Sequence, residues 1–300
     1  MKKIKEALRE GLPCNKKGFL NSYLANIYQG NMSDEFCDMI DKGSGNELHS
    51  KARAVHSSSM LGYNFFHWVS SNRPIIIDGV KYKKVFFEVK MRVLKGTTPA
   101  NMDVLLIGEK SGRTQLLFIE SKFLEYTQSQ KYSLSASYRE TSKWYIHEGR
   151  DWNSFLDDVK DCVDEANCGY KGGIKQGVSH LFAISNLANK RAFNSFVSVN
   201  NLQIHLKGKS YEDVDIHFLN VVFEPSVLFE NEHEQFKVYR VLYNQLIDLT
   251  EKYGLKKPKF MTYSELWQMV GKQIEKVHQG HLYQYLEERY MRFAEMQKNL

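Results

Sequence analysis

The sequence has little of what marks a zinc-binding, secreted or membrane protein. It contains four cysteines, and no two of them have the CxxC spacing of a zinc site. The longest apolar runs are far too short to span a bilayer, and the basic N-terminus, MKKIKEALREGLP, lacks the apolar stretch of an export signal. We therefore expect reduced thiols and a cytoplasmic protein that does not enter a membrane.

Several familiar motifs of nucleotide-binding proteins and hydrolases are also missing. There is no Walker loop, no GxGxxG dinucleotide motif and no GxSxG nucleophile elbow. No internal repeat or low-complexity segment is present, and no stretch has the composition of a linker. With 300 residues, 42% of them hydrophobic, the chain can bury a sizeable core. The simplest interpretation is a single domain over residues 1–300.

What the sequence does contain is a change of hydrophobic period. Residues 46–71 carry small and apolar side chains at three- and four-residue spacing, which predicts one long helix packed on a sheet. The period then becomes two. Residues 74–93 predict a short strand, a turn at Asp78-Gly79 and a longer strand, and residues 101–108 and 114–122 predict two more strands.

The second half of the chain alternates between helical and apolar segments. We expect helices over 152–166 and 171–188, a strand over 215–223, and a helical tail from about residue 233, broken near 254–258 and 280. The earlier strands make an antiparallel meander, and the last strand can return parallel to it through the helices. This order predicts an α/β fold with a mixed central sheet flanked by helices. Its parts would be a helical N-terminal segment over residues 1–45, a core over 46–225 and a helical C-terminal extension over 226–300.

Two acidic residues and a lysine stand out in these apolar strands. Glu120 and Lys122 are two residues apart, so they point to the same face of a strand. If Ser111-Gly112 form the centre of a tight turn, Asp103 lies directly opposite Glu120, with Cβ atoms about 5 Å apart. Two carboxylates so close together in a buried sheet repel each other unless a cation or a proton compensates them.

A divalent cation would resolve this conflict. Mg²⁺ or Mn²⁺ takes oxygen ligands and keeps several waters, so two carboxylates and a substrate phosphate suit it. Lys122, on the same face, can pair with the carboxylates, orient an attacking water or neutralise a phosphate. Together these groups are what phosphodiester hydrolysis requires. The alternative is that Glu120 and Lys122 form an exposed strand pair, with Asp103 as a surface acid.

A run of basic residues precedes these strands. One acid, Glu88, lies among six basic residues that together predict a surface for nucleic-acid phosphates: Lys81, Lys83, Lys84, Lys90, Arg92 and Lys95. The alternative is an ordinary solvated strand face. The net charge of +6 is too small to decide between these interpretations.

The order of Asp103, a hairpin and Glu120-Ser121-Lys122 resembles the PD-(D/E)XK nuclease superfamily. More narrowly, the chain resembles an uncharacterised bacterial family with HSSSxLxxN, FExK, PxxxDV and ESKFxEY motifs. The matching segments are residues 43–64, 87–90, 99–104 and 120–126. Where the superfamily name places a proline next to the aspartate, this chain has Pro99 four residues before it.

The resemblance implies a restriction-endonuclease-like core and a nuclease that uses Mg²⁺ or Mn²⁺. It implies that Asp103 and Glu120 hold the metal and that Lys122 assists the attacking water. DNA is the expected substrate and RNA is possible, while endonuclease and exonuclease action both stay open. The main alternative is a non-catalytic nucleic-acid-binding protein on the same fold.

The same comparison supplies three further candidates for the site. Glu47 resembles a helical glutamate that often completes the metal site, although an acid is also favoured at a helix N-terminus. Glu88 lies beside Asp103 and is either a third metal ligand or a counter-charge for its basic neighbours. Gln176 resembles a helical glutamine that faces such sites, and is otherwise part of a helix surface.

Overall fold

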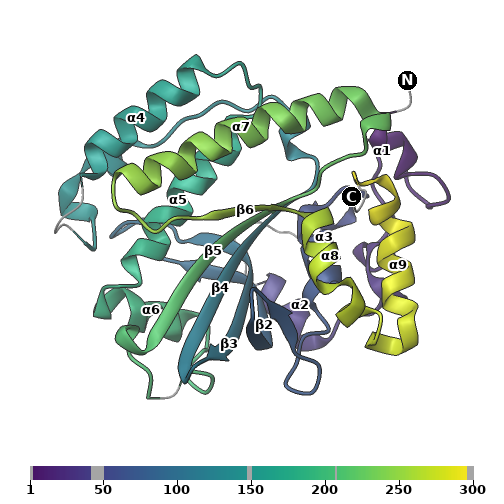
Figure 1. The fold of residues 1–300 in the computed structure, drawn as a ribbon, viewed down its shortest axis with the longest axis horizontal. Helices are drawn as coiled ribbons and strands as arrows, with labels where there is room; N and C mark the ends of the chain where they lie inside the picture. Colours follow the sequence, from purple (N-terminus) through teal and green to yellow (C-terminus); the bar gives the residue numbers. More distant parts are fainter. Residues whose placement is uncertain (1–2, 42–50, 147–150, 207, 296–300) are drawn as a thin grey trace.

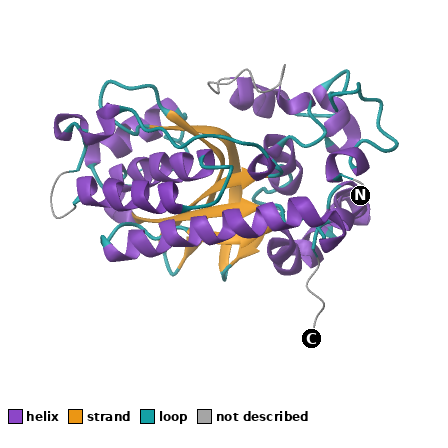
Figure 2. Cartoon of the chain, turned by 90° about the horizontal axis from the view of Figure 1, so that it is seen from above, coloured by secondary structure: helices purple, strands orange, loops and turns teal. Residues whose placement is uncertain are grey.

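The computed structural model describes residues 3–41, 51–146, 151–206 and 208–295. Within these ranges the chain forms one curled, mixed sheet of six strands with helices on both faces (Figures 1 and 2). The strands follow one another across the sheet in chain order: β1 (Ile75–Ile77), β2 (Val80–Met91), β3 (Ala100–Lys110), β4 (Arg113–Lys122), β5 (Val214–Val222) and β6 (Lys259–Thr262). The predicted α/β class with a mixed central sheet is therefore confirmed.

The first four strands form an antiparallel meander, and β5 and β6 run parallel to β4. Ser111 and Gly112 join β3 to β4 with positive φ angles of 50° and 77°. Two such residues give a turn whose twist matches that of the flanking strands, so the turn fixes the register. Val104 pairs with Ile119, as the predicted register requires.

Helices fill the connection between β4 and β5, which makes the parallel return possible. The two predicted helices are present as α4 (Trp152–Glu165) and α5 (Gly172–Asn186). A third helix, α6 (Lys190–Val199), follows them and was not predicted. Asp151 caps α4 by accepting a hydrogen bond from the backbone N–H of Ser154.

The C-terminal part differs from the expected helical tail. Within the described ranges it contains three α-helices: α7 (Glu230–Lys252), α8 (Tyr263–Ile274) and α9 (His281–Arg289). Between α7 and α8 it adds the strand β6 to the sheet. The prediction missed β6 because it has four residues and too little alternation to be recognised. Thr262 ends it and at once caps α8, through a reciprocal pair of hydrogen bonds with Glu265.

The predicted long helix over 46–71 is wrong for its described part. The N-terminal helices are α1 (Ile4–Ala7), α2 (Asp34–Asp41) and α3 (Ser58–Phe66), and α3 has only nine residues. Residues 53 and 55 use their backbone groups to bond residues 18–20, so they cannot continue a helix. Ser57 then caps α3 by accepting from the N–H of Met60.

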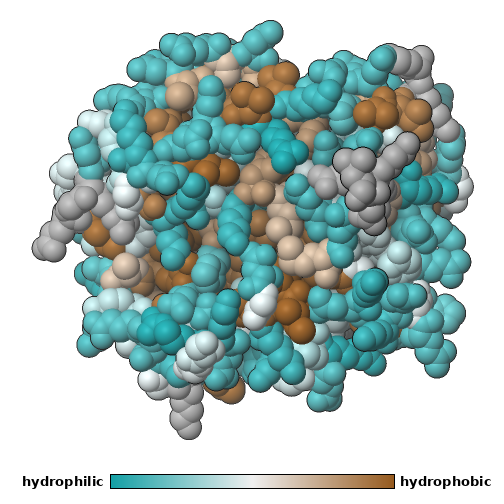
Figure 3. Space-filling model, viewed as in Figure 1, coloured by the Kyte–Doolittle hydropathy of each residue, from teal (hydrophilic) through white to brown (hydrophobic). Residues whose placement is uncertain are grey.

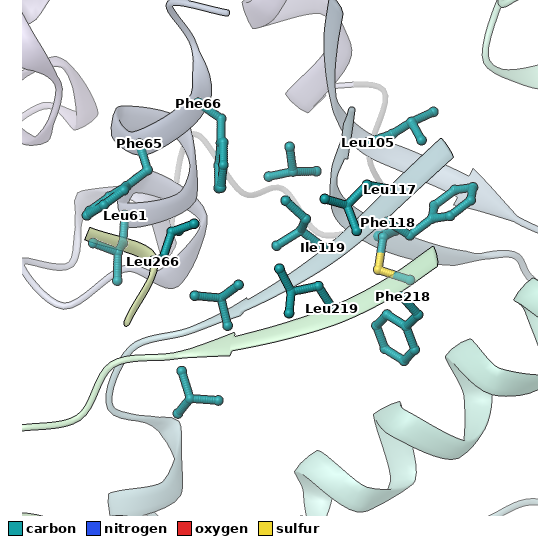
Figure 4. Packing of buried hydrophobic residues seen from close by; sticks show 14 of the residues in the cluster. Leu61, Phe65, Phe66, Leu105, Leu117, Phe118, Ile119, Phe218, Leu219 and Leu266 are labelled. Carbon is teal, nitrogen blue, oxygen red and sulfur yellow. The ribbon is translucent and has the colours of Figure 1, made fainter. Parts of the chain in front are cut away.

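The two faces of the sheet are covered by different helices. On one face, Phe65 of α3 and Leu266 of α8 lie on the side of Ile119, whereas Phe118 and Phe218 point to the other side (Figure 4). Phe118 meets Phe196 of α6, with ring centroids 5.6 Å apart. Glu120 and Lys122 continue the face of Phe118, because side chains alternate along a strand.

Gly62 lets α3 approach β4 closely. A Cβ placed on Gly62 would lie 3.3 Å from the Cβ of Ser121, a tighter contact than most side chains make. This is the close packing on a sheet that the small residues of the segment predict, and it is confirmed at this position.

The two ends of the described chain meet in one core. A single cluster of buried apolar residues extends from Ile4 to Ala294. Arg289 of α9 is buried and donates to the side chain of Asn26 (3.0 Å) and to the carbonyl of Val55 (2.9 Å). The C-terminal helix therefore fixes the segment that leads into α3.

The surface seen in Figure 3 is mainly hydrophilic, with apolar residues in small separate groups. Most of the large apolar side chains belong to the buried cluster. In the part of the chain that the structure describes, no helix is both long and apolar enough to cross a membrane.

Candidate active site

The site begins where β3 and β4 separate. Their ladder ends at Val104 and Ile119. Beyond that point β3 stays paired with β2, and β4 stays paired with β5 through Lys122. Asp103 and Glu120 are the next residues on the two diverging strands. Oδ2 of Asp103 accepts a hydrogen bond of 2.6 Å from the backbone N–H of Ser121, so a side chain continues the connection between the strands.

Glu120 and Lys122 form a buried ion pair on the α5–α7 side of the sheet. Nζ of Lys122 donates to Oε1 of Glu120, and each residue is 5% exposed. Asp103 as a whole residue is half-buried, so it is more exposed than Glu120 or Lys122. The three predicted residues thus lie together, although Asp103 and Glu120 stand one position beyond the end of the regular ladder.

The charges in this cluster influence one another strongly. Burial raises the pKa of Asp103 well above its usual range, and the charge of Glu120 raises it further, while Lys122 opposes both. Burial alone would lower the pKa of Lys122, but the neighbouring acids, led by Glu120, outweigh it and leave that pKa above its usual value. Lys122 therefore stays protonated, and it can neutralise charge or orient a ligand but not accept a proton.

His180 of α5 is part of the cluster, and the sequence did not reveal it. Its Nδ1 lies 3.5 Å from Oε2 of Glu120, and its Nε2 lies 3.2 Å from the backbone oxygen of Asn101 on β3. The imidazole therefore bridges the two diverging strands. Burial lowers the pKa of His180, which the charge of Glu120 only partly offsets. No local pattern marks this histidine; its distance from Gln176, one helical turn, is the only hint.

The cluster contains buried polar atoms that lack a partner. Oε2 of Glu120, Nδ1 of His180 and Oδ1 of Asn220, the β5 neighbour of Glu120, make no hydrogen bond with any described residue. Such atoms are rare in folded proteins because each costs desolvation energy. Similar atoms occur elsewhere in the described chain, for example on Tyr132 and Ser264, but these three lie together in the cluster of Glu120, Lys122 and His180.

These atoms fit a divalent cation with few protein ligands. Oε2 of Glu120 is unpartnered, and Oδ1 of Asp103 likewise accepts no hydrogen bond from the described residues. Two carboxylates suit Mg²⁺, which keeps several waters in its shell. Among the described residues no group of three or more His, Cys, Asp or Glu side chains is arranged to hold a metal ion. Glu47, the proposed additional ligand, lies outside the described residues.

Glu88 lies opposite Asp103 on the other side of β3. The pairs Phe87 with Val104 and Val89 with Met102 place it there. Glu88 is 8% exposed, and its Oε2 accepts from the side-chain amide of Asn101 (3.1 Å). Its charge is one of the causes that raise the pKa of Asp103. Its φ of 50° is unusual for a glutamate, so the backbone of β2 is strained beside the cluster.

Gln176 lies on the exposed surface of α5. His180, one turn later, is the α5 residue that reaches Glu120.

The predicted basic stripe falls into two groups along β2. The register with β3 shifts between Tyr82 and Lys84 and then stays constant across Glu88, in spite of the positive φ of that residue. Lys81, Lys83 and Lys84 lie near the end of β2 that is beside the β3–β4 turn. Lys90, Arg92 and Lys95 lie near the end that is beside Asp103. Lys84 is also engaged, with its Nζ 2.6 Å from Nδ1 of His205. Only the second group is close along the sheet to the carboxylates.

The chain matches no protein-family model, no curated protein and no solved structure. The resemblance to PD-(D/E)XK nucleases therefore stays a hypothesis that depends on the residues themselves. Any function must be inferred from the group at the separation of β3 and β4, which we call the Asp103 cluster: Asp103, Glu120, Lys122 and His180.

Proposed function

We propose that the protein is a metal-dependent nuclease that hydrolyses phosphodiester bonds in DNA, on a restriction-endonuclease-like core. The observation that carries the proposal is the Asp103 cluster itself. A structural ion pair in an apolar sheet needs one acid and one base, whereas this cluster adds a second carboxylate and leaves oxygens unpartnered. Keeping such a group costs several kcal/mol unless a ligand compensates it.

Each residue of the cluster has a role in this proposal. Asp103 and Glu120 would hold Mg²⁺ or Mn²⁺, which when bound makes water more acidic and polarises a phosphoryl oxygen. Lys122 is held in its charged form by its neighbours, so it would stabilise the negative charge that grows on the phosphate. Glu88, next to Asp103, and Glu47 remain candidates for a further ligand.

The surroundings of the cluster support a nucleic-acid substrate. Lys90, Arg92 and Lys95 lie on the part of β2 and the following loop that lead toward Asp103. Positive side chains that neutralise phosphates supply much of the affinity for a nucleic acid. The mixed sheet, with an antiparallel meander and parallel β5, also agrees with the proposed core.

The decisive experiment is incubation with linear and circular DNA in the presence of Mg²⁺ or Mn²⁺. Cleavage of circular DNA would identify an endonuclease, and degradation of linear DNA alone an exonuclease. Labelled RNA in a parallel reaction tests the other substrate. If the folded protein cuts none of these with either metal, the proposed function is wrong.

A non-catalytic nucleic-acid-binding protein is the second candidate. Two observations favour it: no three-ligand metal group is present among the described residues, and Lys122 already neutralises Glu120. Divalent-cation binding separates the two candidates. Mn²⁺ binding that disappears in Glu120→Ala supports the nuclease, and nucleic-acid binding without any Mn²⁺ binding supports the alternative.

A further inference from the structure

A pocket lies inside the curl of the sheet, toward the end of the strands that is away from the Asp103 cluster. All six strands contribute to its lining, from Ile77 of β1 to Lys259 of β6. The two edge strands are tied together beside it, because Lys259 forms an ion pair with Asp78, in the turn between β1 and β2. Gln273 of α8 also exchanges two hydrogen bonds with the backbone of Ile76, of 2.8 and 3.0 Å. The frame of the pocket is therefore the sheet itself.

The buried part of the lining is mainly apolar. Gly108 of β3 pairs with Tyr82 of β2, and a Cβ placed on Gly108 would lie 2.8 Å from Cδ1 of the tyrosine. The tyrosine ring therefore lies close against the backbone of β3. The volume of the pocket is about 240 Å³. This is room for one aromatic ring and a small charged group, since a cavity of about 150 Å³ already holds benzene. The apolar side chains of the lining include Ile77, Val80, Tyr82, Leu117 and Leu219.

The rim of the pocket is positively charged. Among the described residues it carries four exposed lysines and one acid, Asp78: Lys110, Lys256, Lys257 and Lys259. Lys259 pairs with Asp78 and Lys257 with Glu251. Lys110 and Lys256, in contrast, form no ion pair with a described residue. A cleft lined by charge of one sign attracts ligands of the opposite sign.

His217 and Gln115 form a polar part of the wall. Nε2 of Gln115 donates to Oδ2 of Asp215 (2.7 Å), so Oε1 of Gln115 faces His217 and accepts from its Nε2 (2.9 Å). Burial lowers the pKa of His217, and the charge of Lys256 lowers it further, so the charge of the rim reaches into the pocket. These hydrogen bonds hold the wall in one arrangement before a ligand binds, which reduces the entropic cost of binding.

We infer that this pocket binds a small aromatic anion, with its ring against the apolar side chains and its phosphate or carboxylate beside Lys110 and Lys256. An apolar pocket with a few convergent polar groups is the usual form of a small-molecule site. The site is separate from the Asp103 cluster, because Gln115 and Leu117 point to the face of β4 opposite Glu120. The inference goes beyond the proposed nuclease and does not depend on it.

Methyl-group nuclear magnetic resonance tests the site directly. Protein with ¹³C-labelled methyl groups of Ile, Leu and Val is titrated, without divalent metal, with phenyl phosphate, benzoate and thymidine 5′-monophosphate. These represent an aryl phosphate, an aromatic carboxylate and a nucleotide. At least one should shift the signals of Ile77, Leu117 and Leu219 saturably, and the tightest of the three identifies the source of the ligand. Conservative substitutions such as Ile77→Val assign the signals. If none of the three shifts them, the inference is wrong.

Two simpler compounds test the two halves of the recognition. Inorganic phosphate lacks the ring and phenol lacks the charge. Each should bind about tenfold more weakly than the best of the three ligands, or weaker still, because it makes only one kind of contact. If either binds at these methyl groups as tightly as that ligand, the pocket does not recognise an aromatic anion and the inference fails.

A pair of charge variants tests the rim. Replacing Lys110 and Lys256 with glutamine should raise the Kd about tenfold, because each exposed charge contributes a factor of a few. The matched control replaces Lys16 and Lys17, two exposed lysines outside the pocket, and should leave the Kd unchanged. An equal loss in both variants, or no loss in either, would contradict the inference.

Glu120→Gln separates this site from the proposed active site. It should bind the aromatic anion as the wild type does, because Glu120 lies on the other face of β4. A variant that loses this binding would place the ligand at the Asp103 cluster instead and overturn the inference. If the wild type cuts no nucleic acid, the proposed function fails, while the methyl titration still decides the pocket.

Discussion

The backbone N–H of Ser121 donates to the carboxylate of Asp103 at the position where β3 and β4 have stopped pairing. One oxygen of Asp103 is thereby fixed against β4, and the other is left for a ligand. The raised pKa of Asp103 follows from the burial of its carboxylate here, to which the charge of Glu120 adds. The same hydrogen bond ties Asp103 to the backbone next to Glu120, whose charge acts on it.

Glu120→Gln should lose divalent-cation binding as well as cleavage. The amide keeps the shape of the side chain but removes the charge that a cation needs. For the wild type, Mn²⁺ at about 100 times its Kd should stabilise the fold by about 2.7 kcal/mol, because the ligand binds only the folded state. Thermal unfolding with and without Mn²⁺ measures this, and Glu140→Gln, at an exposed ion pair with Lys143, is the control. Equal stabilisation of Glu120→Gln would remove Glu120 from the metal site.

Lys122→Ala should lower cleavage about 100- to 1000-fold, the usual effect of removing one electrostatic group that acts in the transition state. Metal and DNA binding should be largely retained, since a protonated lysine is not a metal ligand. Single-turnover cleavage and Mn²⁺ titration measure the two effects. Lys160→Ala, which breaks an exposed pair with Asp164, should be neutral. Wild-type cleavage by folded Lys122→Ala would favour the non-catalytic alternative.

The two groups of basic residues should differ in DNA binding. Replacing Lys90 and Arg92 with alanine should reduce the slope of log affinity against log salt by about 0.9 for each phosphate that is no longer neutralised. The corresponding double substitution of Lys81 and Lys83 should change the slope less, because these residues lie at the hairpin end of β2. Affinity measured over a range of salt concentrations compares the pairs. An equal effect of both would mean that DNA follows the whole strand.

Stability should fall in mild acid, partly because of His67. Burial lowers the pKa of His67 to about 4, and its ring stacks on Tyr63 with centroids 4.9 Å apart. The unfolded chain binds this proton near pH 6.5. The folded state therefore favours the neutral ring, and its contribution is complete above pH 6.5 and is lost as the pH falls toward 4.

The loss from His67 is at most about 3 kcal/mol, given about 1.4 kcal/mol for each pKa unit. Urea unfolding at pH 7 and pH 4.5 measures it. His67→Phe should lose less stability over this interval than the wild type does, and the exposed His281→Gln should behave as the wild type. An acid sensitivity that is the same in His67→Phe would show that other groups cause it.

The sequence was sufficient to predict those parts of the fold that neighbouring residues determine. The Ser111-Gly112 turn determines the register of β3 and β4, so the neighbourhood of Asp103 and Glu120 followed from counting residues. The helix over 46–71 failed because spacing alone cannot show that residues 53 and 55 bond to residues 18–20, far away in the sequence. Tertiary contacts of this kind override local periodicity.

The sequence analysis missed His180 for the same reason. His180 belongs to the Asp103 cluster because α5 packs on α7 and turns one residue toward Glu120. Nothing in the residues around His180 encodes that orientation. Similarly, the run of basic residues predicted one surface for phosphates, whereas its members lie in two groups toward the two ends of β2.

The bonds of Arg289 to Asn26 and Val55 join the last helix of the described chain to the segment before α3. During synthesis on the ribosome, that segment emerges more than 200 residues before its partner, since Val55 and Arg289 are 234 positions apart. The core around α3, and with it the contact of Gly62 with Ser121, is therefore completed only after α9 has been made. A nascent chain that already contains Asp103, Glu120 and Lys122 still lacks the hydrogen bonds of Arg289, so this part of the core is completed late in synthesis.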